Sequence, residues 1–172
     1  DLLTEASRAA GIRIDSSYTF PYAGGQCRFR PGDPYNGSRW VGEVLEVAVS
    51  GFTQPPFPGL HRSKLLDVAA ISFREMRDAI LAIITAGADA CLILHSFSLF
   101  KVRDVQYNGG RPDRIVTRRL RRLCEWLAER PDAVPAYTFS DLARSVDEGT
   151  YEARSAPPPR LSLGRADRKS VV

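Results

Sequence analysis

The sequence predicts an α/β fold in which parallel strands form a sheet or barrel with helices packed against it. Strand-like and helix-like segments alternate along the chain, an order typical of parallel sheets. Residues 90–94 form the most apolar strand candidate, with no two-residue period, as expected for a strand buried on both faces. With 172 residues, 44% of them hydrophobic, the chain is long enough for one such domain.

The first half of the chain predicts one helix and two strands. A helix over residues 2–10 stops at Gly11, and a short strand follows at residues 12–14. The long segment 18–41, rich in glycine, proline and aromatic residues, is expected to carry a function or a small hairpin. The next strand, residues 44–49, is followed by a proline-rich loop.

The second half predicts two amphipathic helices. Ser72 and Glu75 have the spacing of a capping box, and one apolar helical face follows until Gly87. A second helix is expected over residues 113–130, with arginines opposite a narrow apolar stripe. Residues 134–139 are the last strand candidate, at a sheet edge because of their proline.

The end of the chain is expected to lack a fixed structure. After a short helix at about residues 140–146, three consecutive prolines stand among many charged residues. We therefore expect one domain over residues 1–146 and a disordered tail over residues 147–172. Because the chain opens at Asp1 within a helix-like segment, we also expect the amino-terminal part of a larger domain to precede it.

Composition excludes several classes of protein. The three cysteines, Cys27, Cys91 and Cys124, form no CxxC pair, so neither a zinc knuckle nor a thioredoxin motif is encoded, and we expect buried free thiols. No apolar run approaches the roughly 20 residues that a membrane span needs. The net charge of +4 is only mildly basic and fits a solvated surface as well as an anionic partner.

His95 is the leading candidate for a functional residue, because it directly follows the most apolar strand. In parallel sheets the functional groups lie just past the carboxyl ends of the strands. An imidazole there can transfer protons near neutral pH or bind a metal. The alternative is a core histidine that bonds a backbone carbonyl. Polar residues also follow the other strands, at Asp15 to Ser17 and at Ser50, and this convergence favours a site.

Four segments in order carry a family resemblance: GIRIDSSYTF, EVLEVAVSGFTQPPFPGL, LILHSFSLF and, after an amphipathic helix, YTFSDLA. Together, over about residues 2–146, they resemble the carboxyl-terminal half of NodB-homology polysaccharide deacetylases. The resemblance implies a partial, distorted (β/α) barrel whose amino-terminal strands are missing. It also implies N-deacetylation of an N-acetylated polysaccharide with the help of a divalent metal, commonly zinc.

The resemblance assigns roles to three residues. His95 corresponds to the histidine that protonates the leaving amine, and Ile93 to the apolar residue that lines the pocket for the acetyl methyl group. Asp15 corresponds to an aspartate that orients or tunes the catalytic histidine. The usual tryptophan of that segment is missing here, and Tyr18 is the nearest aromatic residue.

The metal-binding motifs of that family are absent from this chain. It has neither a paired-Asp motif nor a His-x-x-x-His segment, and its only histidines are His61 and His95. We expect His61 to be a solvated loop residue. No cofactor is therefore expected for this chain alone, and without a metal to activate water the chain should be inactive by itself.

Two other functions stay open. The chain can be a non-catalytic carbohydrate-binding or interaction module derived from such an enzyme, with the aromatic residues of segment 18–41 stacking on sugars or packing on each other. The arginine-rich helix can bind nucleic acid, but a solvated charged face explains it without a partner, so no nucleic acid is expected.

Overall fold

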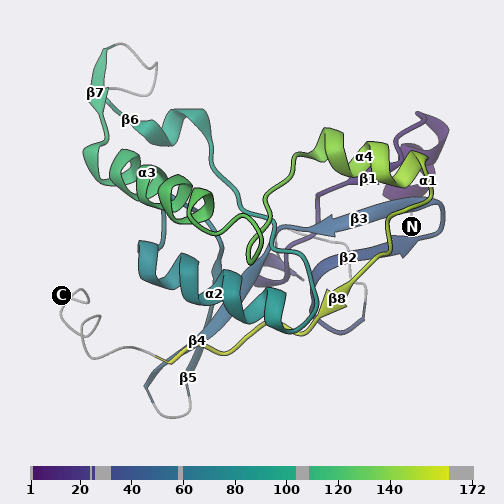
Figure 1. Ribbon diagram of the computed structural model, residues 1–172, viewed down its shortest axis with the longest axis horizontal. Coiled ribbons are helices and arrows are strands. Elements are labelled where there is room, and N and C mark those ends of the chain that lie inside the picture. Colours follow the sequence, from purple (N-terminus) through teal and green to yellow (C-terminus); the bar gives the residue numbers. More distant parts are fainter. Residues whose placement is uncertain (1, 24, 26–31, 58–59, 104–108, 163–172) are drawn as a thin grey trace.

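The computed structural model describes residues 2–23, 25, 32–57, 60–103 and 109–162 (Figure 1). The helices in this part of the chain are α1 (Leu2–Ala9), α2 (Phe73–Thr85), α3 (Arg114–Ala128) and α4 (Phe139–Asp147), with the short 3-10 helices η1 (Phe20–Tyr22) and η2 (Ser96–Leu99). The strands are β1 (Ile14–Asp15), β2 (Asn36–Val41), β3 (Val44–Ala48), β4 (Gly51–Phe57), β5 (Leu60–Leu65), β6 (Phe100–Val102), β7 (Gly110–Pro112) and β8 (Ser155–Ala156).

The largest sheet has the strand order β1-β3-β2-β8. β1 runs parallel to β3, whereas β2 pairs with β3 and β8 in the antiparallel direction. β2 and β3 are joined at Gly42, whose φ of 62° suits a residue without a side chain. Every residue of β3 is buried, as expected for a strand with a neighbour on each side. β2 lies at the end of the long segment 18–41 that the sequence marked as irregular, and β3 matches the strand predicted at residues 44–49.

The second sheet, β4–β5, is a two-stranded ribbon, although the sequence predicted a loop from residue 51 onward. Its prolines are tolerated because the register shifts between Gln54 and Phe57, where Pro55 and Pro56 form no ladder pair. Asn36 connects this ribbon to the larger sheet. Its side chain is fully buried, donates to the Gly51 carbonyl at 2.8 Å and accepts from the Gly51 N–H at 2.9 Å.

The main core lies where α2 and α3 pack over the start of the ribbon and the segment that follows it (Figure 1). Phe52, Leu66, Met76 and Ile80 are fully buried there, and Phe73 meets the ring of Trp126 edge-on. Both helices follow the predicted apolar faces. The capping box of α2 is formed as predicted, since Ser72 Oγ accepts from the Glu75 N–H and the Glu75 carboxylate from the Ser72 N–H.

The predicted strand at residues 90–94 exists only as an extended segment with one bridge. Ile93 is a parallel bridge partner of Asp67, with its N–H bonded to the Leu66 carbonyl and its carbonyl to the Val68 N–H. Residues 91–94 are half-buried, so the expectation of burial on both faces is wrong. The opposite edge of this segment faces residues 133–139, which form no strand either, although we predicted one at 134–139.

The described end of the chain packs on the body, which differs from the disordered tail expected over residues 147–172. β8 pairs with the start of β2, and Ala156 is buried. Leu161 and Pro159 exchange backbone hydrogen bonds with Thr53. Most of these contacts are backbone hydrogen bonds, which do not require apolar side chains, and prolines are tolerated at a sheet edge. Residues 163–172 lie outside the described part.

Within the described residues the sheets do not close into a barrel. The sequence predicted parallel strand pairing, and this is present between β1 and β3 and in the bridge between residues 67 and 93. The hairpins β2–β3 and β4–β5 are antiparallel. The partial (β/α) barrel therefore stays a prediction.

Candidate functional site

His95 lies at the exposed end of the extended segment that precedes η2. Its ring stacks on the ring of Phe97, with centroids 4.8 Å apart and planes inclined by 7°. His95 is exposed, and its carbonyl accepts from the Ser98 N–H. The position is accessible to a large substrate, and it is not that of a core histidine. Ile93, two residues earlier, is half-buried in the bridge to Asp67.

Asp15 ends β1 and is held by its own neighbours. Its carboxylate accepts from the Ser16 N–H at 2.9 Å and from Ser17 Oγ at 2.6 Å. In the parallel register Asp15 lies beside Glu46 of β3. Within the described part of the chain no hydrogen bond or ion pair joins Asp15 to His95, so the pairing that the resemblance implies is not formed in this structure.

The two residues of β1 point to opposite faces of the largest sheet. Ile14, Leu45 and Cys91 share an apolar cluster with Leu142 and Val146 of α4. Because successive side chains of a strand point to opposite faces, Asp15 and Glu46 lie on the other face of the sheet. Asp15 and the Cys91 side chain therefore lie on opposite faces of this sheet.

Glu46 is an acidic residue of this region that the sequence analysis overlooked. It is 5% exposed, and its Oε1 accepts from the Tyr18 N–H at 2.8 Å. Burial raises the pKa of Glu46 from 4.5 to about 7, the Tyr18 bond opposes the rise, and the adjacent Asp15 carboxyl adds to it. The signal was visible in the sequence, since Glu46 is the one charged residue in the apolar run 44–49.

Ser50 hydrogen-bonds Cys91, which lies at the start of the predicted strand 90–94 and not at its carboxyl end. Ser50 Oγ accepts from the Cys91 N–H at 2.9 Å, and the Ser50 N–H donates to the Cys91 carbonyl at 2.9 Å. The Cys91 thiol lies 3.9 Å from Ser16 Oγ. Burial raises the pKa of the Cys91 thiol, Ser16 opposes the rise and Glu46 adds to it, so this thiol is a poor nucleophile at neutral pH.

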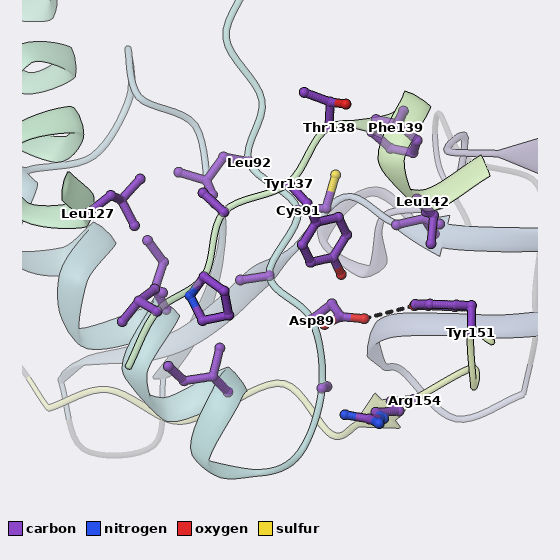
Figure 2. A pocket seen from close by; sticks show the side chains of 18 of the residues that line it. Asp89, Cys91, Leu92, Leu127, Tyr137, Thr138, Phe139, Leu142, Tyr151 and Arg154 are labelled. Carbon is purple, nitrogen blue, oxygen red and sulfur yellow. Dashed lines mark hydrogen bonds between the residues drawn. The ribbon is translucent and has the colours of Figure 1, made fainter. Parts of the chain in front are cut away.

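A cavity of about 610 Å³ lies beside this region, between residues 87–92 and residues 133–139, the second stretch running from the turn after α3 to the first residue of α4 (Figure 2). Its apolar wall comes from α2 and α3 through Ile80, Ile84 and Leu127. Neither Asp15 nor Ile93 nor His95 lines it, whereas Cys91 does. Its volume is in the range of small-molecule sites in proteins.

Polar groups gather at one end of this cavity. The Tyr151 hydroxyl donates to the Asp89 carboxylate at 2.7 Å and lies 2.8 Å from Ser38 Oγ (Figure 2). Burial and the Asp89 carboxylate raise the pKa of Tyr137 far above its usual value. The pKa of Tyr151 rises to about 12, mainly through burial. Both phenols are therefore neutral hydrogen-bond donors at physiological pH.

The other candidate groups offer no metal site. The described residues contain no cluster of three or more His, Cys, Asp or Glu side chains that could hold a metal ion. His61 belongs to β5 rather than to a loop, and its side chain lies outside the described part, as does Cys27. Cys124 is exposed on α3, which corrects the expectation of a buried thiol, while Cys91 is half-buried.

The arginine-rich helix α3 uses two of its arginines for internal contacts. Arg119 donates to the Ala69 carbonyl at 2.9 Å, and the Arg122 guanidinium lies 4.6 Å from the centre of the Phe73 ring. These contacts fit the interpretation of α3 as a packed helix with a solvated charged face. No helix in the described part of the chain has the length and apolar character that crossing a membrane requires.

No protein-family model matches this chain, and no curated protein or solved structure matches it.

Proposed function

We propose that this chain is the carboxyl-terminal part of a carbohydrate N-deacetylase of the NodB-homology type, which hydrolyses acetamide groups of an N-acetylated polysaccharide. The observation that carries the proposal is the position of His95. It follows an extended segment parallel to its neighbour, and its imidazole is exposed where a polymer can reach it. The order of elements along the chain also agrees with such a fold: β1 and β3 come first, and α2 lies between β3 and the extended residues 91–93.

In this proposal His95 is the general acid. Its imidazolium gives a proton to the amine nitrogen as the bond between that nitrogen and the acetyl carbon breaks, so the sugar leaves as an amine rather than as an amide anion. Ile93 lies two residues earlier on the same segment and offers an apolar surface for the acetyl methyl group. Asp15 acts on His95 only if the two move together, because they are not bonded here.

The residues of this chain do not fit the zinc ion that the family uses. The chain lacks the paired-Asp and His-x-x-x-His motifs, and the described residues contain no group of three ligands. The proposal assigns the metal and the activated water to another segment of the parent protein, and this chain alone should neither bind zinc tightly nor release acetate.

The test measures acetate release from an N-acetylated chitin oligomer by the longest protein that the gene encodes. His95→Ala should lower kcat about 10²–10⁴-fold with little change in KM, because a general acid acts mainly in the transition state. The melting temperature should barely change, since the His95 ring is exposed. His61→Ala is the matched control and should keep full activity.

Three outcomes would overturn the proposal. These are no acetate release by the longest protein, unchanged turnover in His95→Ala, or a His95→Ala variant that loses stability but not turnover per folded molecule. The last would identify His95 as a structural residue.

A second candidate function is a non-catalytic binding module, which the cavity beside Cys91 favours. This candidate function predicts that a ligand binds the cavity saturably and that no form of the protein releases acetate. Titration of the chain with ligands and the acetate assay on the longest protein separate the two candidates.

A further inference from the structure

The cavity between segments 87–92 and 133–139 has an apolar body and one charged end. Aliphatic side chains from α2, α3 and α4 form the body, among them Ile80, Leu127 and Leu142. The charged end holds the carboxylate of Asp89 (Figure 2). A volume of about 610 Å³ accommodates a ligand of moderate size.

Asp89 has no cationic partner among the described residues. Its carboxylate accepts from the neutral hydroxyl of Tyr151 at 2.7 Å and is also hydrogen-bonded by the neutral hydroxyl of Tyr137. Arg154 also lines the cavity, but its ion pair, at 4.0 Å, is with Glu152. A half-buried carboxylate beside an apolar wall is costly to desolvate unless a positive charge is supplied, so this end of the cavity favours a cation.

Aromatic rings surround the same end. Tyr137 and Phe139 stand about half-exposed at the opening, and Tyr151 lies across from Tyr137 with Asp89 between them (Figure 2). Ring faces attract ammonium groups, and the combination of a carboxylate with aromatic rings recognises organic amines in many proteins. Because both phenols stay neutral, neither adds a negative charge that a simple metal ion would prefer.

We propose that this cavity binds a small organic amine, with the ammonium group at Asp89 between Tyr137 and Tyr151 and the apolar body against Ile80, Ile84 and Leu127. The ammonium would supply the positive charge that no described side chain brings to this carboxylate, beside the two phenol hydroxyls that already bond it. The proposal is independent of the deacetylase function, because none of the residues assigned to that chemistry lines the cavity.

The test compares two ligands of equal shape by calorimetric titration of the chain: 4-phenylbutylamine and the neutral 4-phenylbutan-1-ol. The amine should bind at least about tenfold more tightly, since ion pairing and ring contacts together contribute on the order of 1–2 kcal/mol. A third titration uses N-acetyl-lysine methylamide. If it binds as tightly as 4-phenylbutylamine, the site is assigned to lysine side chains of a peptide. If it binds more weakly, the site is assigned to free amines.

Substitutions in the cavity wall test where the ligand binds. Asp89→Asn should abolish the preference for the amine, and Ala136→Trp, at the cavity wall, should weaken both ligands. Asp132→Asn, an exposed carboxylate outside the cavity lining, is the control and should bind as the unaltered chain does. The proposal is overturned if the alcohol binds as tightly as the amine, if neither binds at millimolar concentration, or if folded Asp89→Asn keeps the preference. If Asp89→Asn fails to fold, the comparison of the amine with the alcohol on the unaltered chain still tests whether the cavity prefers an ammonium group.

Discussion

Glu46 is a carboxyl group placed in the middle of a buried strand, between Asp15 of β1 and Arg39 of β2 in the register of the sheet. Burial raises its pKa to about 7, so near neutral pH part of the molecules carry a buried negative charge beside another carboxylate. The folded chain therefore binds a proton at Glu46 at pH values where the unfolded chain has released it.

The pH dependence of stability follows from this difference. The contribution of Glu46 is fully present below pH 4.5 and is lost as the pH rises toward 7, so the free energy of unfolding should fall across that window. The pKa difference corresponds to roughly 3 kcal/mol as an upper bound. Glu46→Gln, which can still accept from the Tyr18 N–H, should remove this fall and be more stable than the unaltered chain at pH 8.

Urea unfolding at pH 5 and pH 8 measures both quantities. Glu43→Gln is the control, because Glu43 is exposed in the turn before β3 and should leave the pH dependence as it is. An equal fall of stability with pH in Glu46→Gln and in the unaltered chain would contradict the assignment of the effect to Glu46.

The elements of this fold differ in how far the sequence predicts them. α2 and α3 were predicted closely because their caps and apolar faces are local: Ser72 caps one helix, and Asp113 accepts from the N–H groups of Ile115 and Val116 at the start of the other. Strands depend on partners far along the chain. The apolar run 90–94 has the composition of a central strand, yet one of its edges faces a cavity.

The candidate site was predictable only in part, for the same reason. His95, Ser50 and Asp15 could be found because each follows a strand-like run. Glu46 and Asp89 could not be assigned a role, since their importance comes from what the fold packs around them. The absence of a bond between Asp15 and His95 could not be predicted either, because it depends on how the fold places two segments that are far apart in the sequence.

The capping box of α2 gives a prediction at the scale of the element. Burial alone would raise the pKa of Glu75, but hydrogen bonds from Lys64, at 2.5 Å, and from Ser72 lower it, so Glu75 ties the helix start to β5. Ser72→Ala removes the acceptor for the Glu75 N–H and should cost about 1 kcal/mol of unfolding free energy. Ser72→Thr keeps the hydroxyl and should cost much less. Equal losses in the two variants, measured by urea unfolding, would show that the cap does not stabilise α2.

At the scale of the whole molecule, residues 151–161 connect parts of the chain that are far apart in sequence. Tyr151 bonds Ser38 and Asp89, β8 pairs with β2, and Leu161 bonds Thr53. The close approach depends on Gly37, which has a φ of 87° and where a Cβ would collide with the Arg154 carbonyl. The missing side chain at Gly37 thus leaves the space in which the backbone of residue 154 packs on β2.

A chain ending at Thr150 should therefore be markedly less stable than the full chain. It loses the β8 pairing, the buried Ala156 and both hydrogen bonds of the Tyr151 hydroxyl, and it leaves the Asp89 end of the cavity open. Each buried polar group left without a partner costs about 1–3 kcal/mol, so the total loss should be at least about 2 kcal/mol, or cooperative unfolding should disappear. A chain ending at residue 162 is the reference, because it keeps all of these contacts, and it should unfold at a higher urea concentration than the chain ending at Thr150. If the two chains unfold at the same urea concentration, residues 151–161 do not hold the body together, and the disordered tail that the prolines predicted would be the better description.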